Sequence, residues 1–138
     1  MGSSVDVPFA TLPRVGESIL PGKSLVVVGW GVTESGSTSE KLLMTNMVTI
    51  SLDECQKANP TWLVSTNMFC AIAENSTPCQ GDSGSGIYLI NKNNYELKIL
   101  AGLVSWGNGK CSTEPMIPGG FVDLTNFVIR DWLSVLII

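Results

Sequence analysis

The residues around Ser83 are the ones whose types and spacing could do chemistry. Ser83 follows Gly81 and Asp82 and precedes Gly84. A serine hydroxyl becomes a strong nucleophile when a neighbouring base removes its proton. Glycine and serine also dominate ordinary surface loops, so these four residues by themselves predict a loop as readily as a nucleophile.

Composition and charge exclude several other classes of function. The sequence has 138 residues, 44% of them hydrophobic, which suffices for one buried core and is too little for two ordinary domains. Charged residues make up 14% and the formal net charge is −4, so we expect neither nucleic acid nor a membrane surface as a partner. The segment 127–138 is mostly apolar, but it includes Arg130 and Asp131 and is too short to cross a bilayer. We therefore expect it to form a terminal helix that docks on the domain.

The four cysteines, Cys55, Cys70, Cys79 and Cys111, could form two disulfide bonds in any of three pairings, or remain reduced in a core. A zinc site would have to draw its ligands from scattered cysteines and carboxylates, because there is no histidine and no Cys-x-x-Cys pair. We therefore predict no metal site and no cofactor. Residues 1–8 have neither a basic start nor an apolar run, so we expect no secretion signal within this sequence.

The segments that must position Ser83 resemble short strands separated by turns. Residues 1–23 are interrupted by prolines and glycines and predict an extended surface segment, which leaves residues 24–138 for the main domain. Ser51 and Glu54 predict a serine cap that begins a short helical turn. Short strands between turn signals favour an all-β barrel or sandwich. The expected strands are 25–28, 42–52, 68–72, 86–90, 98–106 and 119–122, followed by a helix over 127–136 that Thr125 or Asn126 could cap.

Several short motifs lie before and after Ser83 along the sequence. They are Gly29-Trp30-Gly31, Met68-Phe69-Cys70-Ala71, Cys79-Gln80-Gly81-Asp82-Ser83-Gly84, Gly102 to Gly107, Cys111, Pro118-Gly119 and a final helix with Trp132. In these motifs the chain resembles the C-terminal half of the catalytic domain of the trypsin/chymotrypsin-like serine protease family (peptidase family S1). The resemblance covers nearly the whole chain. It implies a six-stranded antiparallel Greek-key barrel with a C-terminal α-helix.

The resemblance also implies a role for each residue of the motif. Ser83 would be the nucleophile, and the backbone N–H groups of Gly81 and Ser83 would bind the oxyanion that forms on attack. Asp82 would pair with a new N-terminal ammonium released by zymogen cleavage. Nothing at the start of the sequence resembles that activated terminus, so we expect the loop around Ser83 to relax toward solvent. We also expect the chain alone to be inactive, because the family carries its catalytic histidine and aspartate in the N-terminal barrel.

The family pattern further implies two disulfides, Cys55–Cys70 and Cys79–Cys111, and with them an oxidising, extracellular compartment. Many members cross-link two barrel strands at positions that match Leu25 and Leu89, and here we expect these two apolar side chains to pack together.

The family's pocket base lies six residues before the nucleophile, and 83 − 6 places Thr77 there. With no carboxylate at that position, an intact relative of this chain is expected to favour uncharged substrate side chains. Gly107 and Gly119 match positions that line the pocket. Ser105, Trp106 and Gly107 would offer a strand edge to the substrate backbone.

Three interpretations of function remain open. The chain could be half of a serine endopeptidase, which acts on peptides or proteins once a complementary N-terminal barrel supplies the missing groups. It could be a non-catalytic protease-like module that holds a peptide or an inhibitor without cutting it. It could also be a fragment without a stable fold, because the surface that the partner barrel normally covers is exposed.

Overall fold

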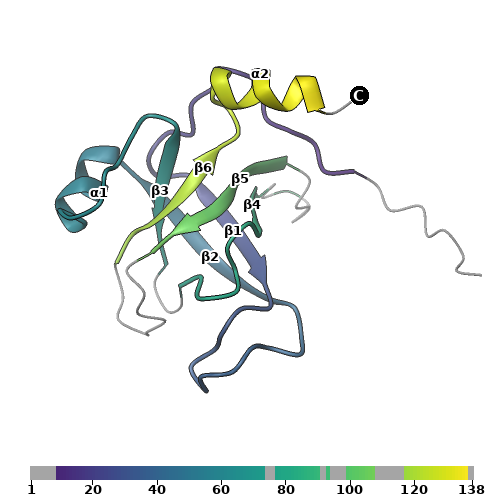
Figure 1. Cartoon of the computed structure of the whole chain (residues 1–138), viewed down its shortest axis with the longest axis vertical. Coiled ribbons are helices and arrows are strands. Elements are labelled where there is room, and N and C mark those ends of the chain that lie inside the picture. Colours follow the sequence, from purple (N-terminus) through teal and green to yellow (C-terminus); the bar gives the residue numbers. More distant parts are fainter. Residues whose placement is uncertain (1–8, 74–76, 91–92, 94–98, 108–116, 137–138) are drawn as a thin grey trace, which may run out of the picture.

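The computed structural model describes residues 9–73, 77–90, 93, 99–107 and 117–136, so residues 1–8, Lys98 and Cys111 lie outside it. In this part of the chain, the strands and the terminal helix agree with the sequence-based expectation to within two residues at their ends, and the short helical turn expected after Ser51 continues as a helix to Ala58. Figure 1 shows the strands gathered around one axis, with α1 beside β3 and α2 well separated from α1. The elements are β1 (Ser24–Gly29), β2 (Leu43–Ile50), α1 (Leu52–Ala58), β3 (Met68–Ile72), β4 (Gly86–Leu89), β5 (Ile99–Trp106), β6 (Gly119–Asp123) and α2 (Phe127–Leu136).

The six strands form one closed sheet. Neighbouring strands are antiparallel and follow the order β1-β2-β3-β6-β5-β4, and β4 pairs back with β1. The predicted six-stranded antiparallel barrel is therefore confirmed. Leu25 and Leu89 are direct partners in the β1–β4 pairing, and both belong to the core or pack against it, as expected.

Every strand of the barrel contributes to its core. Because side chains alternate along a strand, every second residue points inward. Phe69 on β3 and Phe121 on β6 are register partners, and their ring centroids lie 5.4 Å apart in a stacked arrangement. The buried core residues are Leu25, Val27, Met47, Phe69, Ala71, Ala73, Ile87, Ala101 and Phe121.

Residues 9–23 run along the outside of the barrel and are held there by backbone hydrogen bonds. Thr49 of β2 is buried, and its Oγ1 accepts from Lys23 N at 2.8 Å and donates to Leu20 O at 2.6 Å. Farther back, Gly16 N donates to Thr125 O at 2.7 Å. These contacts attach the segment both to β2 and to the turn before α2.

The helix α1 begins at the predicted serine cap. Ser51 Oγ accepts from Glu54 N at 3.2 Å, and Ser51 N donates to Glu54 Oε2 at 3.2 Å, which completes a capping box. The predicted Cys55–Cys70 disulfide is present and joins α1 to β3. Cys79 is also disulfide-bonded, but Cys111 lies outside the described residues, so the pairing of these two stays a prediction.

Removing the α1–β3 cross-link is expected to lower stability substantially. The bond closes a segment with a sequence separation of 15, for which the chain-entropy estimate is about 3 kcal/mol. We therefore expect the Cys55→Ala/Cys70→Ala variant to unfold at a lower urea concentration than the wild type, with a slope that is equal or steeper because the unfolded chain is less compact. Equal midpoints in chemical denaturation would contradict this estimate.

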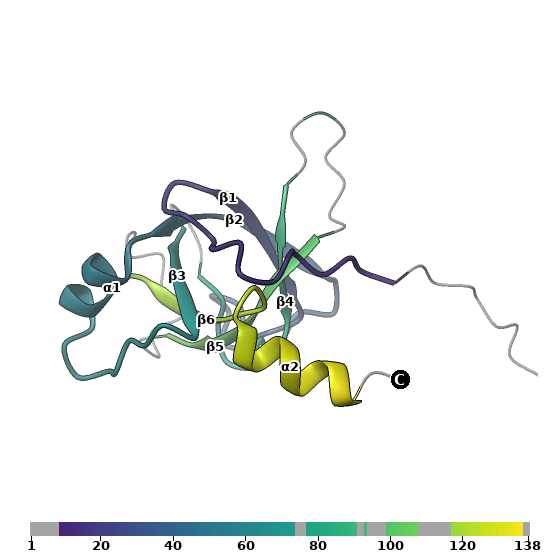
Figure 2. The same ribbon diagram turned by 90° about the horizontal axis from the view of Figure 1, so that it is seen from above.

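The terminal helix α2 is capped by Asn126 and is only partly docked. Asn126 Oδ1 accepts from Val128 N at 3.0 Å, whereas the Thr125 hydroxyl donates to Asp123 Oδ1. Ile129 is half-buried, but no residue of α2 is fully buried, so the expectation of a docked helix is only partly met. Figure 2 shows α2 outside the ring of strands. Its exposed apolar side chains are Phe127, Val128, Trp132, Val135 and Leu136.

Among the described residues, neither helix has the length and apolar character needed to span a membrane.

Candidate active site

Ser83 lies in a tight loop that leads into β4. The loop turns at Gly81 and Gly84, where φ is 92° and 82°, in a region that residues with side chains rarely adopt. Gly84 N donates to Val104 O at 2.9 Å, and Val104 N donates to Ser85 O at 2.9 Å, so two hydrogen bonds hold the loop against β5. Ser83 itself is exposed.

The carboxylate of Asp82, next to Ser83, is buried. The residue is 9% exposed, and its Oδ1 accepts from Gly31 N at 2.8 Å while its Oδ2 accepts from Cys79 N at 2.9 Å. Hydrogen bonds from backbone N–H groups to a carboxylate are charge-assisted and stronger than neutral ones. The expectation that this loop relaxes toward solvent is therefore wrong, because two backbone donors replace part of the lost hydration.

Two glycines at the end of β1 and just beyond it make room for this carboxylate. A Cβ atom at Gly29 or at Gly31 would overlap the carboxylate of Asp82. The Gly-Trp-Gly motif and the Asp-Ser pair are thus parts of one packing unit, although they are far apart in sequence. Residue 31 supplies both the space and one of the two hydrogen bonds.

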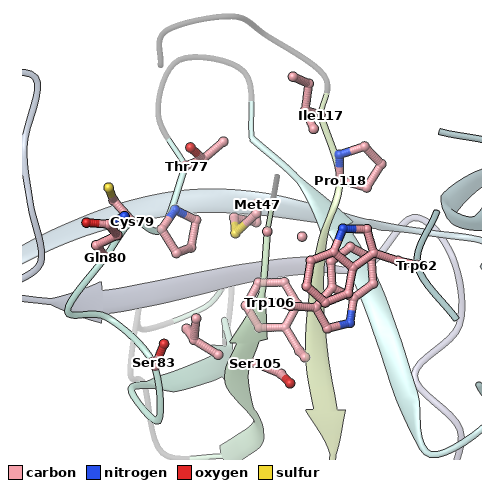
Figure 3. Close-up of a pocket in the computed structure, with 15 residues that line it drawn as sticks. Met47, Trp62, Thr77, Cys79, Gln80, Ser83, Ser105, Trp106, Ile117 and Pro118 are labelled. Carbon is pink, nitrogen blue, oxygen red and sulfur yellow. The ribbon is translucent and has the colours of Figure 1, made fainter. Parts of the chain in front are cut away.

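A cavity opens beside Ser83, and Figure 3 shows the side chains that line it. Its volume is about 260 Å³. None of its described lining residues carries a charge. The hydroxyl of Thr77 is buried and has no hydrogen-bond partner among the described residues. A cavity of this size and character suits a single uncharged side chain. It is lined by Met47, Trp62, Thr77, Pro78, Cys79, Gln80, Ser83, Val104, Ser105, Trp106, Gly107, Ile117, Pro118, Gly119 and Phe121.

The structure brings the residues predicted to bind the substrate together around one cavity, although their roles remain predictions. Gly81 and Asp82 do not line it; they lie in the loop beside Ser83, with the Asp82 side chain directed at Gly31. The predicted substrate-binding residues that do line the cavity with Ser83 are Thr77, Ser105, Trp106, Gly107 and Gly119.

Sequence reasoning missed two prominent parts of the wall, Met47 and Trp62. Met47 is a core residue of β2, and Trp62 lies in the segment that follows α1. The ring of Trp62 stacks on that of Trp106, with centroids 5.3 Å apart and planes at 5°. No local motif marks either residue, because each reaches the cavity only through the closure of the barrel.

The described surroundings of Ser83 contain no side chain suited to act as a general base. No histidine occurs in the sequence, and none of the described residues that line the cavity carries a charge that could take the proton of Ser83. Within the described ranges, no three His, Cys, Asp or Glu side chains gather closely enough to hold a metal ion.

Comparison with solved structures identifies the class of fold. The chain matches neuropsin, a serine protease expressed in mouse brain, with a TM-score of 0.72 over 91% of this chain and 53% of that one. The identity is 22%, so this likeness concerns the fold alone. The closed barrel is that of the chymotrypsin-like serine proteases.

Comparison of sequences identifies the family. The trypsin family model matches residues 2–133. Trypsin eta of Drosophila erecta is 35% identical over 82% of this chain, and trypsin eta of Drosophila melanogaster is 34% identical over 91% of it. The chain belongs to the trypsin family. It spans 41% and 46% of the length of these two relatives, which is somewhat less than half.

Proposed function

We propose that this chain is the nucleophile-bearing half of a serine endopeptidase, active only with a second barrel that supplies the general base. The observation that carries the proposal is the exposed Ser83 at the rim of an uncharged cavity, with the buried Asp82 beside it. A nucleophile next to a pocket for one side chain is the arrangement that acyl transfer from a peptide requires.

In this proposal each residue of the motif has a distinct role. Ser83 Oγ attacks the scissile carbonyl carbon after an imidazole from the second barrel removes its proton. The tetrahedral intermediate then breaks its C–N bond, the leaving amine takes that proton from the imidazole, and water hydrolyses the acyl-enzyme that remains. The backbone N–H groups of Gly81 and Ser83 stabilise the oxyanion. Asp82 acts as a positioning residue, since its hydrogen bonds to Gly31 and Cys79 fix the loop that carries both N–H groups.

The substrate side chain before the scissile bond would enter the cavity beside Ser83. Ser105 and Gly107 would hold the adjacent backbone, while Thr77 and Gly119 would contact the side chain. All four line the cavity, which supports this assignment. The absence of charge on the described walls supports a preference for uncharged residues, because a buried Arg or Lys would find no counter-ion.

Two observations support the second barrel: the sequence has no histidine, and α2 has exposed apolar side chains. The sequence has no histidine, so the base must come from residues outside it. The apolar side chains along α2 are 59–76% exposed, which is typical of a surface that another protein segment covers. The Cys55–Cys70 disulfide supports an oxidising compartment, and we propose an extracellular location.

The proposal is tested by supplying the missing half. The isolated chain should react with a serine-directed phosphonate no faster than its Ser83→Ala variant, because nothing activates the hydroxyl. After co-expression with an N-terminal barrel that carries the family's histidine and aspartate, it should cleave peptides. Ser83→Ala should then lower kcat by at least about 1,000-fold.

Two outcomes would contradict this proposal. Ser83-dependent labelling of the isolated chain at the rate of an intact protease would mean that no second barrel is needed. A complemented protein that binds peptides with the same affinity in wild-type and Ser83→Ala forms, and cleaves none, would instead identify a non-catalytic peptide-binding module.

A further inference from the structure

One side chain of α1 holds the loop that follows this helix. Gln56 Nε2 donates to Asn59 O at 3.0 Å and to Trp62 O at 2.7 Å, and Gln56 Oε1 accepts from Val64 N at 3.1 Å. A single amide therefore satisfies three backbone groups of the segment 59–64. Both N–H donors of the amide are used in this way, together with one of the two acceptor positions of its oxygen.

The helix that carries Gln56 is itself fixed to the barrel. Cys55, the preceding residue, is bonded to Cys70 of β3. Asn59, which ends the helix, is buried and donates from Nδ2 to Cys55 O at 3.1 Å. Surface loops are in general more mobile than the elements they connect. The three hydrogen bonds of Gln56 thus attach the loop 59–64 to a helix that is itself fixed to the barrel.

The loop presents Trp62 to the cavity. Trp62 is 47% exposed, so burial alone holds its ring weakly, and its main partner is the stacked ring of Trp106. The ring of Trp106 in turn lies over Gly120, where a Cβ atom would overlap it. Both indoles line the cavity, so the position of Trp62 determines how far that wall extends.

We propose that Gln56 is a positioning residue for the cavity wall: it holds Trp62 stacked on Trp106 and thereby sets the width of the cavity for the substrate side chain. The second half of this statement rests on the proposed function, whereas the first concerns the chain itself. Without Gln56, Trp62 O and Val64 N exchange a side-chain partner for water, and Asn59 O keeps its hydrogen bond from Trp62 N. The segment after Asn59 then loses its side-chain connection to α1. The indole of Trp62 then leaves Trp106, and the cavity opens to solvent on that side.

The stack is tested in the isolated chain, without any assay of activity. The sequence has four tryptophans, so the indole N–H signals in a ¹⁵N–¹H NMR spectrum can be assigned with single Trp→Phe variants. In Gln56→Ala, we expect the signals of Trp62 and Trp106 to lose the shift caused by the facing ring. Those of Trp30 and Trp132 should stay in place. Gln56→Met, which keeps the length of the side chain and removes its three hydrogen bonds, should behave like Gln56→Ala.

The controls separate the hydrogen bonds from packing and from general loss of structure. Lys57→Ala, on the exposed side of the same helix, should leave all four indole signals unchanged. Unchanged Trp62 and Trp106 signals in both Gln56 variants would overturn the proposal. A shift in Gln56→Ala that is absent in Gln56→Met would also overturn it, because packing and not hydrogen bonding would then hold the loop.

The complemented enzyme tests the consequence for the substrate. Gln56→Met should raise KM for a substrate with a large apolar side chain by about tenfold and change kcat by less than about threefold, since the wall contributes binding and not chemistry. If complementation yields no cleavage at all, the proposed function fails while the NMR result still decides the role of Gln56. If cleavage occurs with unchanged KM, the link between Gln56 and the cavity is refuted.

Discussion

Replacing Gly31 with alanine is expected to lower the free energy of unfolding by about 3–5 kcal/mol, because the new Cβ would occupy the space of the Asp82 carboxylate. The carboxylate would have to leave its buried position. Both of its backbone donors, Gly31 N and Cys79 N, would then lose a charge-assisted hydrogen bond. Chemical denaturation of the purified chain measures this loss.

The matched control is Gly107→Ala. The structure shows no described atom within 4 Å of a Cβ built at Gly107, and its φ is not in the left-handed region, so this change should alter stability by less than about 0.5 kcal/mol. Asp82→Asn tests the contribution of the carboxylate charge to the same packing, since it keeps the shape of the side chain and removes its charge. If Gly31→Ala is as stable as Gly107→Ala, the Asp82 carboxylate does not occupy the cradle between Gly29 and Gly31.

Replacing Thr77 with aspartate is expected to reverse the preference of the complemented enzyme for substrate side chains. The described walls of the cavity are uncharged, and the buried hydroxyl of Thr77 has no hydrogen-bond partner in the part of the chain that the structure describes. A carboxylate at this position would supply the counter-ion that a buried Arg or Lys side chain requires. We expect kcat/KM for Arg substrates to rise by at least about 100-fold relative to Phe substrates, a change of roughly 2.7 kcal/mol in relative transition-state binding.

Matched peptides that differ only in Phe, Leu or Arg before the scissile bond measure this preference. Thr77→Val is the control, because it removes the hydroxyl without adding a charge and should keep the preference for apolar residues. A wild-type enzyme that already prefers Arg would show that Thr77 does not lie at the base of the pocket.

The barrel was largely predictable because its signals are local. The β-branched run before Gly29 predicts a strand, and β1 ends at Gly29. The pair Ser51 and Glu54 predicts a helix start, and α1 begins directly after Ser51. Ser83 and the predicted substrate-binding residues came from motifs whose spacing is shared by the family. The structure then placed the substrate-binding residues around one cavity.

The missed features all depend on contacts between distant residues. The buried position of Asp82 needs Gly31 N, which is 51 residues away along the chain. No sequence motif indicated that Trp62 lines the cavity. Its stacking partner Trp106 comes from β5, which follows the loop of Ser83 along the chain. The weak docking of α2 was missed for a related reason, because an apolar helix pattern does not specify what the helix packs against.

The way the barrel closes also determines when the site forms during folding. The pairings of β1 with β4 and of β3 with β6 join segments distant in sequence, and β sheets dominated by such contacts fold on millisecond to second timescales. We expect the nearer β1–β2 and β4–β5 pairings to form first, since they close shorter loops. Met47 and Trp62 belong to the first half of the chain, whereas Ser83 and Trp106 belong to the second. We therefore expect the cavity beside Ser83 to form in the last step. The hydrogen bond from Gly31 N to Asp82 also joins the two halves, so the loop that carries Ser83 is expected to become fixed in that same step.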